Sequence, residues 1–232
     1  MFRINEVFRS LQGEGPFAGY VTTFIRMCGC NLRCSFCDTA YARQESDEDL
    51  ILEVVETMLF LEQHDLLDDT TKYVCITGGE PLLQPQVFLG AFVKLLLARN
   101  IHVCIETNGS IRLPNPLWNC CFVVDYKLPS SGVEKQMIFN NFFQLRSVDA
   151  IKFVIQSEED WKRFMQVYMD VKKTLQGRSS PMFFVQPALS GGELSEARER
   201  GIWLAEKLMA SRVEVRLSLQ LHKILWGMQR RK

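Results

Sequence analysis

The stretch that decides the fold is Cys28-Gly29-Cys30-Asn31-Leu32-Arg33-Cys34-Ser35-Phe36-Cys37-Asp38-Thr39, which holds four of the eight cysteines of the chain. Cys30, Cys34 and Cys37 are spaced so that one short loop can bring three thiolates to a single inorganic centre. Soft thiolate ligands favour iron–sulfur clusters and zinc. Three thiolates on a cubane cluster leave one iron without a protein ligand, and an open coordination position is a place for chemistry.

A structural zinc site is the alternative for the same loop, because Cys28 could join the other three cysteines and close the coordination sphere. Structural zinc sites usually take two cysteine pairs from separate hairpins instead of one continuous run. Cys28 also ends an apolar, strand-like run, which favours a side chain that points into the core. The loop favours an iron–sulfur cluster, and at this point zinc stays open.

The composition bounds the class of protein. The chain has 232 residues, 47% hydrophobic and 23% charged, which is typical of one large globular domain or at most two. Its 27 basic and 27 acidic residues give no electrostatic reason to expect nucleic acid or an anionic membrane as the main partner. The closing run Arg230-Arg231-Lys232 is short, and we expect it to be solvated.

No apolar run reaches the roughly 18 residues of a spanning helix, so no membrane partner is expected. Residues 1–6 lack the pattern of a secretory signal. Clustered cysteines without such a signal indicate a reducing compartment, and the cytoplasm is the default.

Strands and helices alternate along the chain, which we treat as a single domain over residues 1–232. Strands are expected at residues 4–9, 20–27, 73–77, 101–106, 121–126, 150–155, 182–186 and 213–217. Helices are expected at 47–61, 84–99, 161–175 and 195–209. This order predicts an α/β fold with about six parallel strands, too few for a closed eight-stranded barrel, so an incomplete TIM-like β/α barrel fits best.

Polar residues gather at the expected carboxyl ends of the strands, where such folds place their active sites. They are Arg26, the cysteine loop, Thr77 to Pro81, Glu106 to Asn108, Asp125 to Lys127 and Gln186. Arg26 is a charge near the end of an apolar strand, so it should meet either a ligand anion or a carboxylate of the core. Residues 10–19 contain three glycines and a proline, which suits either a loop that approaches a ligand closely or a plain surface connection.

The segment Thr77-Gly78-Gly79-Glu80-Pro81 follows the strand after the cysteine loop. Together the two motifs resemble the radical S-adenosylmethionine (SAM) superfamily, in which a Gly-Gly-Glu stretch contacts the methionine part of SAM. Within it the chain resembles the 7-carboxy-7-deazaguanine synthase family over essentially its whole length. The residues that carry this resemblance are Asn5 to Phe8, Ser10 to Gly15, Phe24 to Arg26, Cys37 to Thr39, Ile105 to Gly109, Lys127 with Ser131-Gly132, Gln186-Pro187 and Gln220 to Lys223.

The resemblance implies a partial barrel of the radical SAM type and a ring contraction of 6-carboxy-5,6,7,8-tetrahydropterin to 7-carboxy-7-deazaguanine with loss of ammonia. It also implies a [4Fe–4S] cluster, SAM as a reusable cofactor and Mg²⁺. Cys30, Cys34 and Cys37 would hold the cluster and Thr39 would contact Mg²⁺, an ion that accepts few protein ligands. SAM would be lined by Phe36, Cys37, Asp38, Gly79, Asp125, Tyr126 and Lys127, and in part by Gln156, Ser157, Glu158 and Glu159. Leu11, Gln12, Gly13, Arg26 and Thr77 would hold the pterin substrate.

The expected partners are an external one-electron reductant of the flavodoxin or ferredoxin type and a second copy of the chain in a homodimer. The chain departs from many relatives at Asp125-Tyr126, where they carry Ser-Pro, and in the ten residues that follow His222. Cys75, Cys104, Cys120 and Cys121 match no ligand motif and are expected to be buried. Another radical SAM enzyme, such as a glycyl-radical activase, is the alternative within the superfamily, and a non-catalytic metal scaffold is the alternative outside it.

Overall fold

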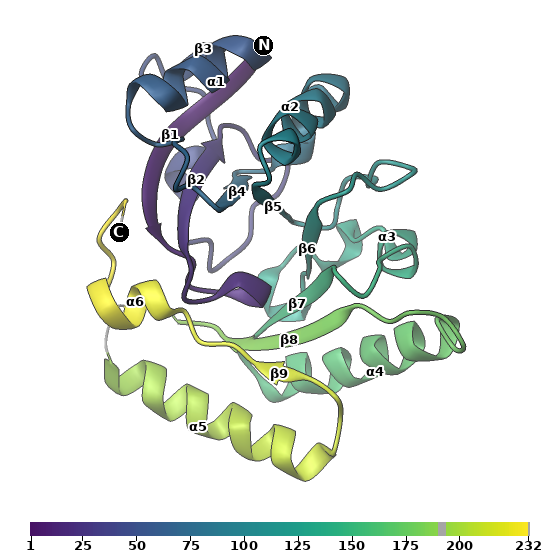
Figure 1. Cartoon of the computed structure of the whole chain (residues 1–232). Helices are drawn as coiled ribbons and strands as arrows, with labels where there is room; N and C mark the ends of the chain where they lie inside the picture. Colours follow the sequence, from purple (N-terminus) through teal and green to yellow (C-terminus); the bar gives the residue numbers. More distant parts are fainter. Residues whose placement is uncertain (190–193, 232) are drawn as a thin grey trace.

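One mixed sheet runs through the chain, which the computed structural model describes over residues 1–189 and 194–231 (Figure 1). The strands are β1 (Phe2–Leu11), β2 (Val21–Met27), β3 (Leu50–Leu52), β4 (Tyr73–Gly78), β5 (His102–Thr107), β6 (Cys121–Tyr126), β7 (Ala150–Ile155), β8 (Met182–Pro187) and β9 (Arg216–Leu217). The helices are α1 (Val54–Gln63), α2 (Gln86–Ala98), α3 (Phe139–Phe143), α4 (Glu158–Thr174), α5 (Leu194–Ser211) and α6 (Leu221–Trp226).

The described strands lie in the order β3-β1-β2-β4-β5-β6-β7-β8-β9. From β2 to β9 every neighbouring pair is parallel, whereas β1 is antiparallel to both β2 and β3. The prediction of an incomplete β/α barrel is therefore confirmed. Its six longer parallel strands match the expected number, and the two-residue β9 is added at one edge.

The two faces of the sheet are packed differently. The larger core lies between the sheet and its helices and contains residues such as Phe92, Phe122 and Phe164. A smaller cluster lies on the other face and includes Cys75, Cys104 and Cys121, which occupy paired positions on β4, β5 and β6. These three cysteines and Cys120 are buried and free, as expected for thiols that act as small hydrophobic side chains.

The main error in the predicted elements lies at residues 47–61, which were expected to form one helix. Residues 50–52 instead form β3, which pairs with β1 from Phe2↔Leu52 to Ile4↔Leu50. The helix starts at Val54 because Glu53 and Glu56 form a capping box, in which the Glu53 N–H donates to Glu56 Oε2 at 2.7 Å. Leu50 and Ile51 matched a helical stripe, but a run of three apolar residues fits a strand equally well. The short helices α3 and α6 were not predicted.

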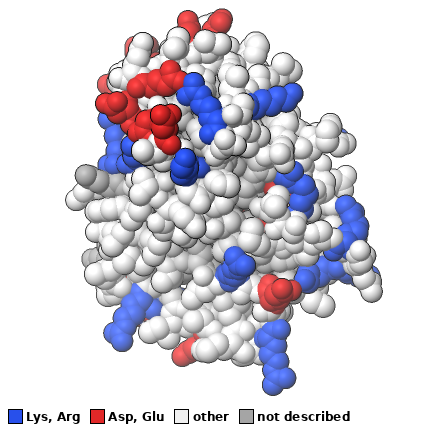
Figure 2. All heavy atoms as spheres, in the orientation of Figure 1, with Lys and Arg blue, Asp and Glu red and all other residues white. Residues whose placement is uncertain are grey.

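Charged side chains are spread over the surface. On the face shown in Figure 2, acidic side chains gather over the region of β3 and α1 with basic side chains beside them, and further basic side chains are scattered over the rest of the face. Within the described residues, no helix combines the length and the apolar character that are needed to cross a membrane.

Candidate active site

The cysteine loop leaves β2 and returns alongside its own start. Two backbone bonds close it: Gly29 N–H donates to Ala42 O at 2.9 Å and Cys30 N–H to Arg43 O at 3.3 Å. The Arg43 side chain then donates to Cys34 O at 3.0 Å. Cys28 is buried with its Sγ 3.1 Å from Gln44 O, so it points into the core as expected.

The three remaining cysteines of the loop lie half-buried on the wall of one cavity. Burial raises the pKa of the Cys34 thiol, with the Lys127 ammonium acting in the opposite direction and Cys37 and Cys30 close enough to add to the rise. Three soft thiols that share a wall are a suitable donor set for an iron–sulfur cluster with one open iron.

The Gly-Gly-Glu segment locks the end of β4 against the cysteine loop. A Cβ atom at Gly79 would lie 2.1 Å from Gly29 O and 2.9 Å from Ala42 O, so only glycine allows this approach. Glu80 is fully buried and accepts hydrogen bonds from Leu82 N–H, Thr107 Oγ1 and Asn108 N–H. Burial raises the pKa of Glu80 above its ordinary value despite these bonds.

Asn108 connects this buried carboxylate to the cluster site. Its side-chain amide lies 3.8 Å from Cys30 Sγ and 3.1 Å from Asn31 Oδ1. The Gly-Gly-Glu segment therefore supports the cysteine loop through backbone contact on one side and through Glu80 and Asn108 on the other.

Most of the predicted site residues share this cavity. It is lined by Leu11, Gln12, Gly13, Arg26, Cys30, Cys34, Phe36, Cys37, Asp38, Thr39, Thr77, Gly79, Asp125 and Lys127. Those from β2, β4, β6 and the cysteine loop lie at carboxyl ends that share one edge, as the parallel topology requires, whereas Leu11, Gln12 and Gly13 come from the end of the antiparallel strand β1.

Five predicted residues lie elsewhere. Tyr126 is turned into the core, where its hydroxyl donates to Glu134 and its ring packs on Phe142 and Phe153. The prediction that Tyr126 lines the SAM site is wrong for this structure, because alternate residues of a strand face opposite sides and Asp125 and Lys127 take the cavity side.

Gln156, Ser157, Glu158 and Glu159 also lie outside the cavity lining. They form the start of α4, where Ser157 is the N-cap and its Oγ accepts from Asp160 N–H at 3.2 Å. Their assignment to SAM is therefore not supported by their position.

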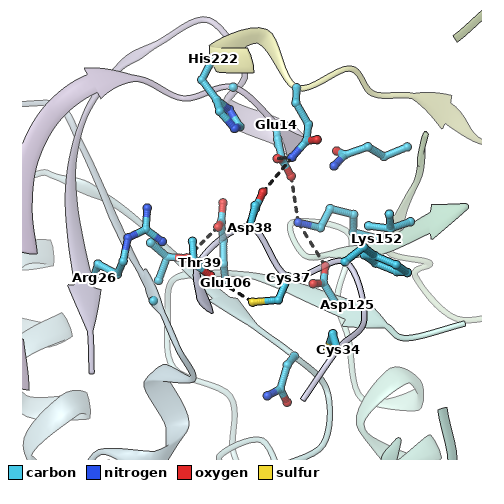
Figure 3. Close-up of a pocket in the computed structure, with 18 of the residues that line it drawn as sticks. Glu14, Arg26, Cys34, Cys37, Asp38, Thr39, Glu106, Asp125, Lys152 and His222 are labelled. Carbon is cyan, nitrogen blue, oxygen red and sulfur yellow. Dashed lines mark hydrogen bonds and ion pairs between the residues drawn. The ribbon is translucent and has the colours of Figure 1, made fainter. Parts of the chain in front are cut away.

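A second group of cavity residues was not predicted, and Lys152 on β7 is its centre. Its ammonium lies 2.9 Å from Glu14 Oε2 and 3.2 Å from Asp125 Oδ1 (Figure 3). Burial alone would raise the pKa of Glu14, but Lys152 and the His222 ring bring that pKa down to about 2. The pKa of Lys152 is raised well above its ordinary value, because its neighbouring carboxylates outweigh desolvation. A signal was available: Lys152 is the one charge in the apolar strand 150–155.

The segment around α6 closes this side of the cavity. Gln220 donates to Glu14 Oε1 at 2.8 Å, and Lys223 pairs with Asp38 at 3.0 Å. A Cβ atom at Gly13 would lie 2.3 Å from His222 Nδ1, so the loop after β1 and α6 meet at a glycine. His222 lies in the cavity wall beside Glu14 (Figure 3).

The opposite side of the cavity carries one further carboxylate, Glu106, and a second, Glu6, lies next to Arg26 outside the cavity lining. Glu106 accepts from Gln12 Nε2 at 3.0 Å and from Thr77 Oγ1 at 2.9 Å. Glu6 accepts from Arg26 Nε at 2.8 Å. Arg26 therefore meets a core carboxylate through Nε, while its side chain also forms part of the cavity wall.

Comparisons with known proteins agree with this geometry. Residues 24–114 match the radical SAM superfamily. The chain is 34% identical to the 7-carboxy-7-deazaguanine synthase of Methanospirillum hungatei, over 96% of this chain and 85% of that protein. It is also 34% identical to the enzyme of that name from Clostridium acetobutylicum, over 99% of this chain and 98% of that protein.

Among solved structures, the crystal structure of QueE from Escherichia coli superposes with a TM-score of 0.69 at 23% identity, covering 94% of this chain and 93% of that one. That likeness supports the fold. The full-length sequence relatives, together with the three-cysteine loop and the Gly-Gly-Glu segment, show that the chain belongs to the 7-carboxy-7-deazaguanine synthase family of radical SAM enzymes.

Proposed function

We propose that this chain converts 6-carboxy-5,6,7,8-tetrahydropterin into 7-carboxy-7-deazaguanine with loss of ammonia, as a single radical SAM domain over residues 1–232. The observation that carries the proposal is that the three-cysteine loop and a set of hydrogen-bonding groups suited to a pterin line the same cavity. The family membership supplies the reaction, and the cavity supplies a place for the cofactors and the substrate together.

Cys30, Cys34 and Cys37 would hold a [4Fe–4S] cluster, and SAM would lie against Gly79 and the cavity faces of Phe36, Asp38, Asp125 and Lys127. When bound, the reduced cluster supplies the electron for reductive cleavage of SAM. The role of this chain is to orient the substrate and to exclude water and stray hydrogen donors. Gly79 suits a position next to SAM because it has no side chain, so its backbone can lie against both the cysteine loop and the cavity.

The pterin substrate would form hydrogen bonds with Gln12, Glu106 and Thr77, which lie together in the cavity lining. An ionised carboxylate has about four acceptor sites. Glu106 uses two of them within the chain, which leaves capacity for N–H groups of a ligand. The substrate carboxylate would meet the free Nη groups of Arg26, whose planar fork suits paired hydrogen bonds.

Thr39 would contribute an oxygen to Mg²⁺ at the substrate. Its Oγ1 lies 3.7 Å from Cys37 Sγ, so an ion bound there would sit beside the cluster loop. Hard oxygen ligands from one threonine, water and substrate fit the habit of Mg²⁺ to keep several positions for small ligands.

We also propose that the enzyme works in the cytoplasm as a homodimer with a flavodoxin- or ferredoxin-type reductant. The free cysteines among the described residues support a reducing compartment. A cluster of this type needs an external one-electron donor, and the family expectation supplies the dimer.

An anaerobic assay tests the function. Reconstituted protein is incubated with dithionite, SAM, Mg²⁺ and 6-carboxytetrahydropterin, and mass spectrometry follows 7-carboxy-7-deazaguanine and ammonia. Cys34→Ala should abolish the product, whereas Cys28→Ser, a change at the one loop cysteine that faces the core, should retain it. Cleavage of SAM without any deazaguanine would contradict the substrate and favour another radical SAM reaction.

A further inference from the structure

The single carboxylate of Glu6 forms ion pairs with three arginine side chains. Its Oε1 accepts from Arg26 Nε and from Tyr41 Oη, each at 2.8 Å. Its Oε2 accepts from Arg230 Nη2 at 3.1 Å and from Arg231 Nε at 3.2 Å. The Glu6 side chain is 1% exposed, so these contacts define its surroundings.

Arg230 and Arg231 were expected to be solvated as part of a basic run, and their side chains are indeed 52% and 63% exposed, but the prediction missed that both also pair with Glu6. The segment after α6 runs back along β1, so that residues 225 positions apart in the chain meet (Figure 1). The Arg230 guanidinium also lies 3.8 Å from the centroid of the Tyr41 ring, a cation–π contact. Two independent contacts therefore hold Arg230 in place.

The carboxylate at the centre of this cluster is charged. Burial tends to raise the pKa of Glu6, but Arg26 and Tyr41 hold it below the ordinary value, so Glu6 is ionised at neutral pH. Three guanidinium groups surround the one Glu6 carboxylate, although Arg230 and Arg231 are partly exposed to solvent and Asp38 also lies close enough to act on Arg26.

Arg230 and Arg231 also determine how Arg26 binds Glu6. A carboxylate with both oxygens free pairs with arginine through two parallel hydrogen bonds, the stronger arrangement. Here Oε2 of Glu6 is taken by Arg230 and Arg231, so Arg26 makes one bond, through Nε. Within residues 1–189 and 194–231 the Nη groups of Arg26 have no hydrogen-bond partner, and Arg26 lines the cavity, so they are available to a ligand there.

We propose that Arg230 and Arg231 are positioning residues for the substrate carboxylate, because they occupy Oε2 of Glu6 and so leave the Nη groups of Arg26 free to pair with that carboxylate. This inference rests on the proposed function and adds two residues to its substrate site. It predicts selectivity for a carboxylate-bearing pterin over the same ring without the carboxylate.

The test measures equilibrium binding of 6-carboxypterin and of pterin to the reconstituted enzyme with SAM, by anaerobic dialysis and fluorescence of the free ligand. The Arg230→Ala/Arg231→Ala variant should bind 6-carboxypterin at least about tenfold more weakly, the ordinary effect of losing a charge-assisted contact. Its affinity for pterin should stay within about twofold, which separates a lost carboxylate site from a damaged fold. Arg178→Ala/Arg198→Ala removes two exposed arginines away from the cavity and is the charge-matched control.

Arg230→Lys/Arg231→Lys should recover most of the selectivity, because ammonium groups can also occupy Oε2. Unchanged selectivity in the double alanine variant would overturn the proposal, as would an equal loss of affinity for both pterins. Turnover of 6-carboxytetrahydropterin by the wild-type enzyme is measured in parallel. A wild-type enzyme that selects the carboxylate but forms no deazaguanine would refute the proposed reaction and leave the positioning role standing.

Discussion

Replacing Lys152 with methionine should destabilise the protein in a way that depends on pH. Methionine keeps the length and the apolar stem of the lysine but removes the ammonium that lies between Glu14 and Asp125. Asp125 retains Lys127 as a partner, whereas Glu14 loses the cation that lowers its pKa most. Glu14 is therefore the group that determines the effect.

The pKa of Glu14 gives the size of the stability loss that we expect for Lys152→Met. Its fall from 4.5 to about 2 corresponds to about 3 kcal/mol of stability at neutral pH, since one pKa unit is worth about 1.4 kcal/mol. That contribution is present above pH 4.5 and is lost as the pH falls toward about 2. Burial opposes this fall, so the lowering contributions of Lys152, His222 and Gln220 together exceed it, and losing Lys152, the largest of them, should cost about 3–5 kcal/mol at pH 7.5.

The direction of the pH effect follows from the burial of Glu14, which remains after Lys152 has been replaced. Without Lys152, burial raises the pKa of Glu14 in the folded state above its unfolded value, so the penalty grows as the pH rises through the new pKa. The deficit relative to wild type should thus be smaller at pH 5 than at pH 7.5. Anaerobic urea unfolding followed by circular dichroism at both pH values measures it.

The Glu14→Gln/Lys152→Met variant is the control, because it removes both charges of the pair. It should recover a substantial part of the stability that Lys152→Met loses. A loss below about 0.5 kcal/mol, the usual range of surface substitutions, or a deficit that does not change with pH, would refute this account of Lys152.

Three further changes test other parts of the site. Gly79→Ala should abolish SAM binding or prevent folding, because the new Cβ would lie 2.1 Å from Gly29 O; soluble protein with normal SAM affinity by dialysis would contradict this. Thr39→Ala should weaken the response of turnover to added Mg²⁺ while the visible spectrum of the cluster is kept, and an unchanged titration with Mg²⁺ would remove Thr39 from the metal site. Asn108→Ala should reduce the yield of intact cluster on reconstitution, because it removes the contacts to Cys30 Sγ and Asn31; equal iron content would argue against it.

The parallel strands were the most predictable part of the fold. β6 and β7 were predicted to the residue, because a strand that is buried on both faces reads as an unbroken apolar run between turn residues. The strand β3 and the short helices α3 and α6 were missed for the opposite reason. Segments of three to six residues carry too few positions to show a period, so tertiary pairing decides their state.

The cavity was predictable as far as topology dictates it. In a parallel sheet the carboxyl ends of the strands share one edge, so polar residues that follow different strands must meet there. Tyr126 shows the limit of this topological argument, which places the end of a strand but not the direction of each side chain. Three consecutive residues cannot all face one cavity on an extended backbone, and the structure selects Asp125 and Lys127.

Arg26 can serve both of the partners that the sequence analysis treated as alternatives. From the sequence, a ligand anion and a core carboxylate were competing partners for one charge. A guanidinium, however, carries five N–H donors pointing in different directions, so its Nε can bond Glu6 while its Nη groups remain at the cavity. Glu6 faces Arg26 across the β1–β2 ladder, a register that the hairpin could have suggested. Nothing in the sequence linked either residue to Arg230, since that contact depends on the path of the chain after α6.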